Sequence, residues 1–213
     1  MTSRVRRGQL SSRSLEPGQQ RHSDAAVRFL CARVPGRVGH VLSYLLGETL
    51  TQRVVERSVD SDAVLEVISL TRSEVVKHGV SLQTQLATDL AIKGDRTLLQ
   101  QVILNLILNA IEAMSSLEDR PRELLITTER EVSGGVLVTV QDSGPGFDPQ
   151  SVDRLFEAFY TTKPEGTGMG LAICRSIIET HGGRLWATAN KPRGAVFQLS
   201  FPPAEDDTVP VSE

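Results

Sequence analysis

The stretch from Asp95 to about Ser115 constrains the fold of this chain more than any other segment. Asp95 can cap a helix, and apolar residues then recur every three or four positions. At about 100° per residue these side chains form one stripe that must be buried; they are Leu99, Val102, Ile103, Leu106, Ala110 and Ala113. The longest apolar run, Val102–Ile111, is interrupted by Asn105 and Asn109. The run falls short of the about 18 residues that span a bilayer, so we expect a core helix and no membrane segment in this chain.

Asn105, Asn109 and Glu112 form a polar flank beside the apolar stripe, because residues three and four apart share one face of a helix. A buried amide without a partner costs free energy, so two asparagines on one flank need partners. An amide oxygen is a hard, neutral ligand that suits Mg²⁺. A polar flank that faces water is the alternative, and the helix alone does not decide between the two.

The rest of the chain alternates between helical and strand patterns. We expect a helix from Asp60 or Ser61 to about His78 and a strand with one buried face at 80–86, followed by the helix at 95–115. Later elements are strands at about 123–130 and 136–141, a helix at about 168–181, and strands at about 184–190 and 195–201. This order predicts an α/β protein, a two-layer sandwich of one mixed sheet with helices on one face, preceded by a short helical segment.

Asp142 stands at the end of a predicted strand and is followed by Ser143-Gly144-Pro145-Gly146. A carboxylate at a strand end can accept a hydrogen bond from an exocyclic amine, and the glycines let the backbone approach a flat ring. An ordinary Asp-Ser-Gly-Pro turn would show the same residues. Residues 143–168 are rich in Gly and Pro, and a loop this long inside a compact domain is usually functional.

Gly166-Thr167-Gly168-Met169-Gly170-Leu171 opens the predicted helix at 168–181. Free backbone N–H groups and the positive end of the helix dipole can hold a phosphate at such a place. The pattern is neither a Walker loop nor a dinucleotide-binding fingerprint, because no Lys-Ser/Thr follows and no strand immediately precedes it. Lys163, just upstream, can supply a cation for the outer phosphates. A flexible hinge is the alternative.

Charge and cysteine content narrow the function class. Ten arginines and four acidic residues give residues 1–57 a net charge of +6, whereas the whole chain has a net charge of −3. No nucleic-acid motif accompanies the basic region, so we expect no nucleic-acid partner. Cys31 and Cys174 are too few for a disulfide framework, which favours a reducing cytoplasmic location. We expect a flexible basic leader at 1–23, a short helical segment at 24–57, a folded domain at 58–202 and an acidic tail at 203–213.

Together the three motifs resemble the catalytic ATP-binding domain of bacterial sensor histidine kinases, in the superfamily shared with type II topoisomerases. The resemblance covers about residues 60–202 and implies the Bergerat-type ATP-binding fold. The matching blocks are Gly94-Asp95 through Asn105-Leu106 and Asn109-Ala110 (N box), Asp142–Gly146 (G1 box), Phe156–Phe159 with Thr161–Lys163 (F box and lid), Gly166–Leu171 (G2 box) and His181–Arg184.

The resemblance implies ATP and Mg²⁺ as cofactors and assigns roles by position. Asn109 would bind Mg²⁺, with Asn105 beside it as a second candidate ligand, and these two with Lys163 would be the catalytic residues. Asp142 would accept the adenine amine, and Gly144 and Gly146 would shape the adenine pocket. Residues implied at the phosphates are Thr162, Lys163, Gly166, Thr167, Gly168, Met169, Gly170 and Leu171.

As a sensor kinase domain, residues 58–202 would transfer the γ-phosphate of ATP to a histidine, in cis or in trans, for relay to a response regulator. Segment 24–57 is too short for the full dimerisation hairpin of the family and reads as a remnant of it, so a homodimer would need a hairpin upstream. None of the four histidines is followed by an acidic residue, as the family's acceptor histidine usually is.

Two alternatives remain open at this point. The chain is a truncated or orphan ATP-gated interaction module, or it is a serine kinase or ATPase of the same superfamily. The latter enzymes place a glutamate general base four residues before the metal-binding asparagine. Asn105 stands at that position here, which argues against them.

Overall fold

The computed structural model describes residues 57–59, 61–88, 90, 92–117, 120–163 and 166–203. The leader expected at 1–23, residues 24–56 of the expected helical segment and residues 204–213 of the acidic tail lie outside this part of the chain. Arg57, the last residue of the segment expected to be helical, lies instead in strand β1 (Arg57–Val59).

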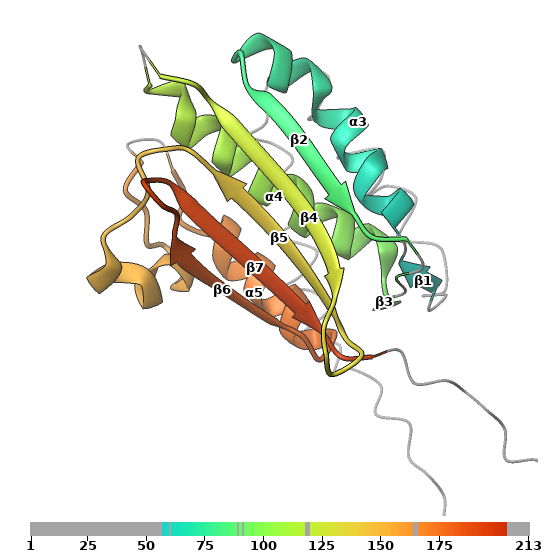
Figure 1. The fold of residues 1–213 in the computed structure, drawn as a ribbon. Helices are drawn as coiled ribbons and strands as arrows, with labels where there is room; N and C mark the ends of the chain where they lie inside the picture. The colour runs from blue at the N-terminus through green and yellow to red at the C-terminus, as the bar shows by residue number, and fades with distance from the viewer. Residues whose placement is uncertain are drawn as a thin grey trace, which may run out of the picture.

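In the described part of the chain, five strands form the main sheet in the order β2-β4-β5-β7-β6. Strand β2 is parallel to β4, and the other neighbours are antiparallel, so the sheet is mixed. Three helices cover one face of it, which confirms the predicted two-layer sandwich (Figure 1). The elements are α3 (Ser61–Lys77), β2 (Ser81–Leu86), α4 (Arg96–Ser115), β4 (Glu123–Arg130), β5 (Val136–Asp142), α5 (Gly170–Thr180), β6 (Arg184–Ala189) and β7 (Ala195–Phe201).

Three short features differ from the sequence prediction. Strand β1 pairs antiparallel with β3 (Ile92–Gly94), and a 3₁₀ helix, η1 (Pro149–Phe156), lies within the Gly- and Pro-rich stretch. Three-residue strands carry too little periodicity to be recognised. The predicted buried face of the strand at 80–86 comprises Val80, Leu82, Thr84 and Leu86. Thr84 is exposed instead, because β2 lies at an edge of the sheet.

Helix α4 is the central element of the helical layer and packs against α3, α5 and β5. Its N-cap is Asp95, as predicted, and the Oδ1 atom accepts hydrogen bonds from the backbone N–H groups of Thr97 and Leu98 at 2.9 and 3.1 Å. The predicted apolar stripe is buried except for Ala113, which is half-buried. Within the described residues α4 alone is long and apolar enough to cross a membrane, but it is largely buried in the core.

His181 joins the C-terminal end of α5 to the start of α4. Its Nε2 atom accepts a hydrogen bond from the backbone N–H of Asp95 at 3.0 Å, and Nδ1 lies 2.7 Å from the carbonyl oxygen of Ile177. The ring therefore carries its proton on Nδ1. Gly94 makes the contact feasible, because a Cβ atom there would collide with the imidazole ring. The histidine thus fixes the spacing between the two helices that flank the site described below.

We expect His181→Phe to lower the free energy of unfolding by about 1–3 kcal/mol, because the substitution leaves the partly buried Asp95 N–H without its acceptor. Urea denaturation monitored by circular dichroism measures the change. His78→Phe is the matched control, since within the described residues the His78 ring makes a single 3.5 Å contact, with Glu74. Equal losses in the two variants would contradict a specific role for His181.

Candidate functional site

Asp142 is the most deeply buried charged residue of the candidate site, with 3% of its surface exposed. It ends β5, and its Oδ1 atom accepts hydrogen bonds from the backbone N–H groups of Gly144 at 2.8 Å and Ala195 at 3.3 Å. Burial raises the pKa of this carboxyl group above its ordinary value of 3.8, and the two hydrogen bonds oppose the shift. Within the part of the chain that the structure describes, both bonds go to Oδ1, so the second oxygen is available to a ligand donor there.

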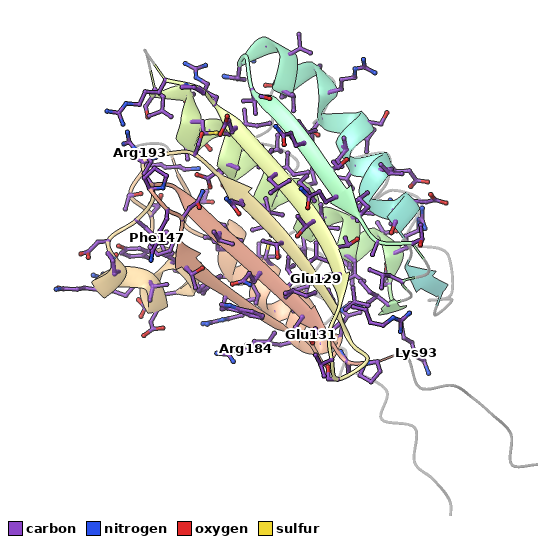
Figure 2. All side chains as sticks on the ribbon, viewed as in Figure 1. Lys93, Glu129, Glu131, Phe147, Arg184 and Arg193 are labelled. Atoms are coloured by element: carbon purple, nitrogen blue, oxygen red, sulfur yellow. The ribbon has the colours of Figure 1, made fainter. Side chains whose placement is uncertain are left out.

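The turn between β6 and β7 completes this end of the sheet. Asn190 donates from Nδ2 to the backbone oxygen of Asp142 at 2.8 Å, and its Oδ1 atom accepts from Gln141 Nε2 at 3.1 Å. Gly194 lies so close to Asp142 that a Cβ atom would collide with the Asp142 carbonyl oxygen. Figure 2 shows Phe147 and Arg193 at this end of the molecule, opposite Glu131 in the hairpin between β4 and β5.

Gly144 brings the Asp142 turn directly onto α4. A Cβ atom on Gly144 would lie 2.7 Å from Asp142 Oδ1, so a side chain there would displace the carboxylate, whereas its 3.5 Å distance from the Ala113 side chain is an ordinary contact. Gly146 has φ +77°, in the left-handed region, and a Cβ atom there would lie 2.8 Å from the Gly194 carbonyl oxygen. The crowding at both positions explains why glycine stands there in the turn beside Asp142.

Asn105 faces α5 rather than water. Its Nδ2 atom lies 3.2 Å from Cys174 Sγ, and a Cβ atom on Gly170 would lie 3.1 Å from its Oδ1 atom. Burial raises the pKa of the Cys174 thiol to about 12, against the opposing hydrogen bond from Asn105, so the thiol stays protonated at neutral pH. The half-buried amide therefore has a fixed partner, and its oxygen lies at the first residue of α5.

Lys163 and Asn109, which are 54 residues apart, are in direct contact. The Lys163 ammonium donates to Asn109 Oδ1 at 3.2 Å and to Glu112 Oε2 at 2.6 Å. The polar flank of α4 is thus occupied by a cation from the loop that precedes α5. Thr161 supports this loop, because its Oγ1 atom accepts from the Lys163 backbone N–H at 3.0 Å. Thr162 is exposed and makes no hydrogen bond within the described residues.

The glycine loop leads into the N-terminal end of α5. The carbonyl oxygen of Gly168 accepts from the Phe159 N–H at 2.9 Å. Glycine is required at 168 for two reasons: φ is +66°, and a Cβ atom would collide with the Phe159 backbone. Met169 is the N-cap and makes no side-chain capping bond. The first-turn N–H groups of α5 are therefore available to an anion. Gly166 and Thr167 are half-buried in the same loop, and Leu171 packs against the core.

The three predicted motifs meet along one side of α4. Gly144 of the Asp142 turn lies beside Ala113, the Lys163 ammonium contacts Asn109 and Glu112, and Asn105 contacts Cys174 of α5 next to Gly170. Eight residues of helix separate the first and last of these positions, or about 12 Å. The arrangement offers a buried acceptor at one end, a cation and an amide oxygen in the middle, and an open helix N-terminus at the other end.

The sequence patterns do not predict the contacts of four residues of this arrangement. Glu112 lies on the polar flank with no predicted partner, and Cys174 is predicted and found in the core without a predicted link to Asn105. Asn190 lies at the end of the strand predicted at 184–190, and Gly194 lies in the turn that follows it. Their contacts join positions 48 to 69 residues apart, and no local pattern encodes such pairs. The one available signal was that Glu112 lies three residues from Asn109 on the same helix face.

A sequence profile described as histidine kinase-, DNA gyrase B-, and HSP90-like ATPase matches residues 94–205, more than half of the chain. This chain belongs to that family, and within it the similar proteins below are sensor histidine kinases. Sensor histidine kinase TmoS of Ectopseudomonas mendocina is 40% identical over 154 residues, 71% of this chain and 16% of TmoS. Sensor protein FixL of Bradyrhizobium diazoefficiens is 43% identical over 116 residues, 54% of this chain and 23% of FixL.

Solved structures agree with this assignment. A catalytic domain of histidine kinase ThkA is 35% identical, with a TM-score of 0.60 over 67% of this chain and 91% of that one. Full-length ShkA in complex with AMPPNP is 26% identical, with a TM-score of 0.62 over 77% of this chain and 36% of ShkA. The matched part of this chain spans between about a sixth and about a third of the length of the curated sensor kinases that it matches.

We expect the stability difference between the wild type and Asp142→Asn to depend on pH. Because the pKa of Asp142 is raised in the folded protein, the carboxyl group keeps its proton at pH values above 3.8, at which the unfolded chain has lost it. The stabilisation that the Asp142 carboxyl group contributes is therefore fully present below pH 3.8, and it is lost as the pH rises through the raised pKa. The free energy of unfolding of the wild type minus that of the variant should accordingly fall between pH 3.8 and neutrality.

Urea unfolding at both ends of this window measures the difference. The asparagine keeps an Oδ1 acceptor for Gly144 and Ala195, so the variant should fold. Asp153→Asn, which alters an exposed carboxylate on η1, is the control. A difference that rises with pH would contradict the assignment of burial as the dominant influence on Asp142.

Proposed function

We propose that this chain is the ATP-binding catalytic part of a two-component sensor histidine kinase, which transfers the γ-phosphate of ATP to a histidine for relay to a response regulator. The observation that carries the proposal is the convergence of Asp142, Lys163 and the start of α5 on one side of α4. Family membership and the likeness to ThkA and ShkA support it. A domain that uses ATP in this way belongs in the cytoplasm.

In this proposal each end of the nucleotide meets a different kind of group. The free oxygen of Asp142 accepts a hydrogen bond from the adenine amine, and the glycines beside it leave room for the ring. The first-turn N–H groups of α5 hold phosphate oxygens. Lys163 neutralises charge on the outer phosphates, which is the main demand of phosphoryl transfer besides positioning.

Mg²⁺ fits the donor set on α4. Asn109 supplies a neutral oxygen on a rigid helix, and Mg²⁺ is commonly held by few protein oxygens together with substrate phosphates and water. Such an ion would neutralise charge between the phosphates. Asn105 is tied to Cys174 and lies at the start of α5, so its place is beside the phosphates, with its oxygen as the second candidate ligand.

The proposed partners follow from the reaction. A phosphoacceptor domain, in cis or in trans, must supply the nucleophilic histidine, and a response regulator must take the phosphoryl group onward. A ThkA structure that is 25% identical to this chain is a complex with the response regulator TrrA. Asn105 is a neutral amide and cannot take a proton from water or serine as a glutamate base would, which disfavours an ATPase or a serine kinase.

We expect Asp142→Asn to weaken ADP binding by about 10–150-fold. The substitution keeps the size of the side chain but places an NH₂ donor opposite the adenine amine, and a lost charge-assisted hydrogen bond costs about 1.5–3 kcal/mol. Isothermal titration calorimetry with ADP and Mg²⁺ measures the affinity. Asn109→Leu serves as the comparison and should lose only the part of the affinity that EDTA removes from the wild type. Unchanged affinity in Asp142→Asn would remove the adenine assignment.

We expect the purified chain to bind MgATP but to form little acid-labile phosphohistidine alone. In-line transfer needs a histidine held at the γ-phosphate, with a neighbouring group that orients its proton. His40, the one histidine on an expected upstream helix, lies outside the described residues and is followed by Val41. Incubation with γ-labelled ATP, with and without an added dimerisation domain of a related kinase, measures the transfer. Strong acid-labile labelling of the chain alone that His40→Gln abolishes would make His40 the acceptor.

A further inference from the structure

The Lys163 ammonium is held on α4 by two side chains of different character. It lies 2.6 Å from Glu112 Oε2, a charged pair, and 3.2 Å from Asn109 Oδ1, a neutral acceptor. The shorter distance and the opposite charge make Glu112 the principal partner. Lys163 is 35% exposed and Glu112 61% exposed, so the pair is accessible to water and readily exchanged for another partner.

The contact places a cation on the oxygen that the proposed function assigns to Mg²⁺. An ammonium group at 3.2 Å from Asn109 Oδ1 and a metal ion bound to the same oxygen would repel each other at close range. The same ammonium group is the cation that the proposed function assigns to the outer phosphates, so phosphate oxygens would compete with Glu112 for it. Glu112 would therefore control both the access of a metal ion to Asn109 and the transfer of Lys163 to the phosphates, provided that it holds Lys163 only while nucleotide is absent.

We propose that Glu112 is a positioning residue that holds the Lys163 ammonium against Asn109 in the nucleotide-free protein, and that the phosphates release it. This inference rests on the proposed nucleotide site and adds its regulation. The held lysine keeps the lid segment, residues 157–163, attached to α4 and covers the metal-ligand oxygen. Phosphate oxygens then compete with Glu112 for one ammonium group, and its departure exposes Asn109 to the ion.

The lid segment has its own hydrogen bonds that report on this attachment. The backbone N–H groups of Phe159 and Lys163 donate to Gly168 O at 2.9 Å and Thr161 Oγ1 at 3.0 Å. Phe159 is 75% exposed and has a positive φ of 69°, so packing of its side chain does little to hold the segment. Within the described residues, the Lys163 side chain supplies the segment's charged attachment to α4.

The first test needs no nucleotide. Glu112→Gln and Lys163→Met should both speed hydrogen–deuterium exchange of amides in residues 157–163 severalfold, because either change breaks the charged contact. Glu74→Gln is the matched control, since it removes the carboxylate of another exposed Glu–Lys pair, with Lys77 at 3.2 Å, on α3. Exchange rates in both variants equal to the wild-type rate would overturn the proposal.

The second test is a double-mutant cycle on ADP affinity in EDTA, where no metal ion competes. Glu112→Gln should tighten binding about two- to fivefold more in the wild-type background than in the Lys163→Met background, a range that matches exposed ion pairs. Equal gains in both backgrounds would mean that Glu112 acts only by repelling phosphate and would overturn the proposal. A loss of affinity confined to the wild-type background would do so too, because Glu112 would then orient Lys163 in the bound state.

The two tests also separate this inference from the proposed function. A wild-type chain that binds no ADP would contradict the nucleotide site, while the exchange experiment would still measure whether Glu112 holds the lid segment. Normal ADP binding with unchanged exchange in Glu112→Gln and Lys163→Met would leave the nucleotide site in place and remove the role of Glu112.

Discussion

The burial of α4 between the sheet and the two other helices is the constraint on which the rest of the site depends. Eleven of its 20 residues are buried, so the helix has little freedom to rotate or slide. Its Asn105 and Asn109 side chains therefore keep fixed directions although neither is fully buried. A one-position rotation of the helix would bury these amides without partners and expose leucine and isoleucine instead, which would cost several kcal/mol.

Glycine is needed wherever another segment must approach α4 closely. Gly144 and Gly170 stand at the two ends of the site: a Cβ atom on Gly144 would lie 2.7 Å from Asp142 Oδ1, and one on Gly170 would lie 3.1 Å from Asn105 Oδ1. A side chain at Gly144 would therefore displace the Asp142 carboxylate, and one at Gly170 would require the Asn105 amide to shift by a few tenths of an ångström. The glycines that suggested a nucleotide site in the sequence therefore act first by letting three separate segments share one helix face.

Sequence patterns predicted the elements that have strong periodicity and local start signals. The Asp95 cap, the α4 stripe and the alternating valines of β5 depend on neighbours within a few residues, and the structure confirms them. Strands β1 and β3 were missed because three residues show no period, and Thr84 was misassigned because burial of β2 depends on its place at the sheet edge. The candidate site shows the same difference between local patterns, which the sequence predicts, and contacts that depend on the whole fold.

The individual motifs of the site were visible in the sequence because each is a short local pattern. Their contacts were not, because the Lys163–Glu112 pair and the Asn190–Asp142 bond join residues 51 and 48 positions apart. Only the fold brings such residues together. The resemblance to a family predicted which residues belong to the site, but not which of them touch before a ligand is present.

The contacts that already exist divide the proposed site into fixed and exchangeable parts. Asp142 is held by backbone N–H groups and the start of α5 is held by helix packing, so neither has to give up a side-chain partner to meet a ligand. Lys163 differs, because its ammonium group already has an anionic partner in Glu112. Recognition of the adenine end would therefore use groups in place, whereas recognition of the outer phosphates would replace one anion by another at a single cation. An exchange of this kind would yield less free energy than the binding of a phosphate to an unpaired ammonium group, because the ion pair with Glu112 is lost as the new one forms.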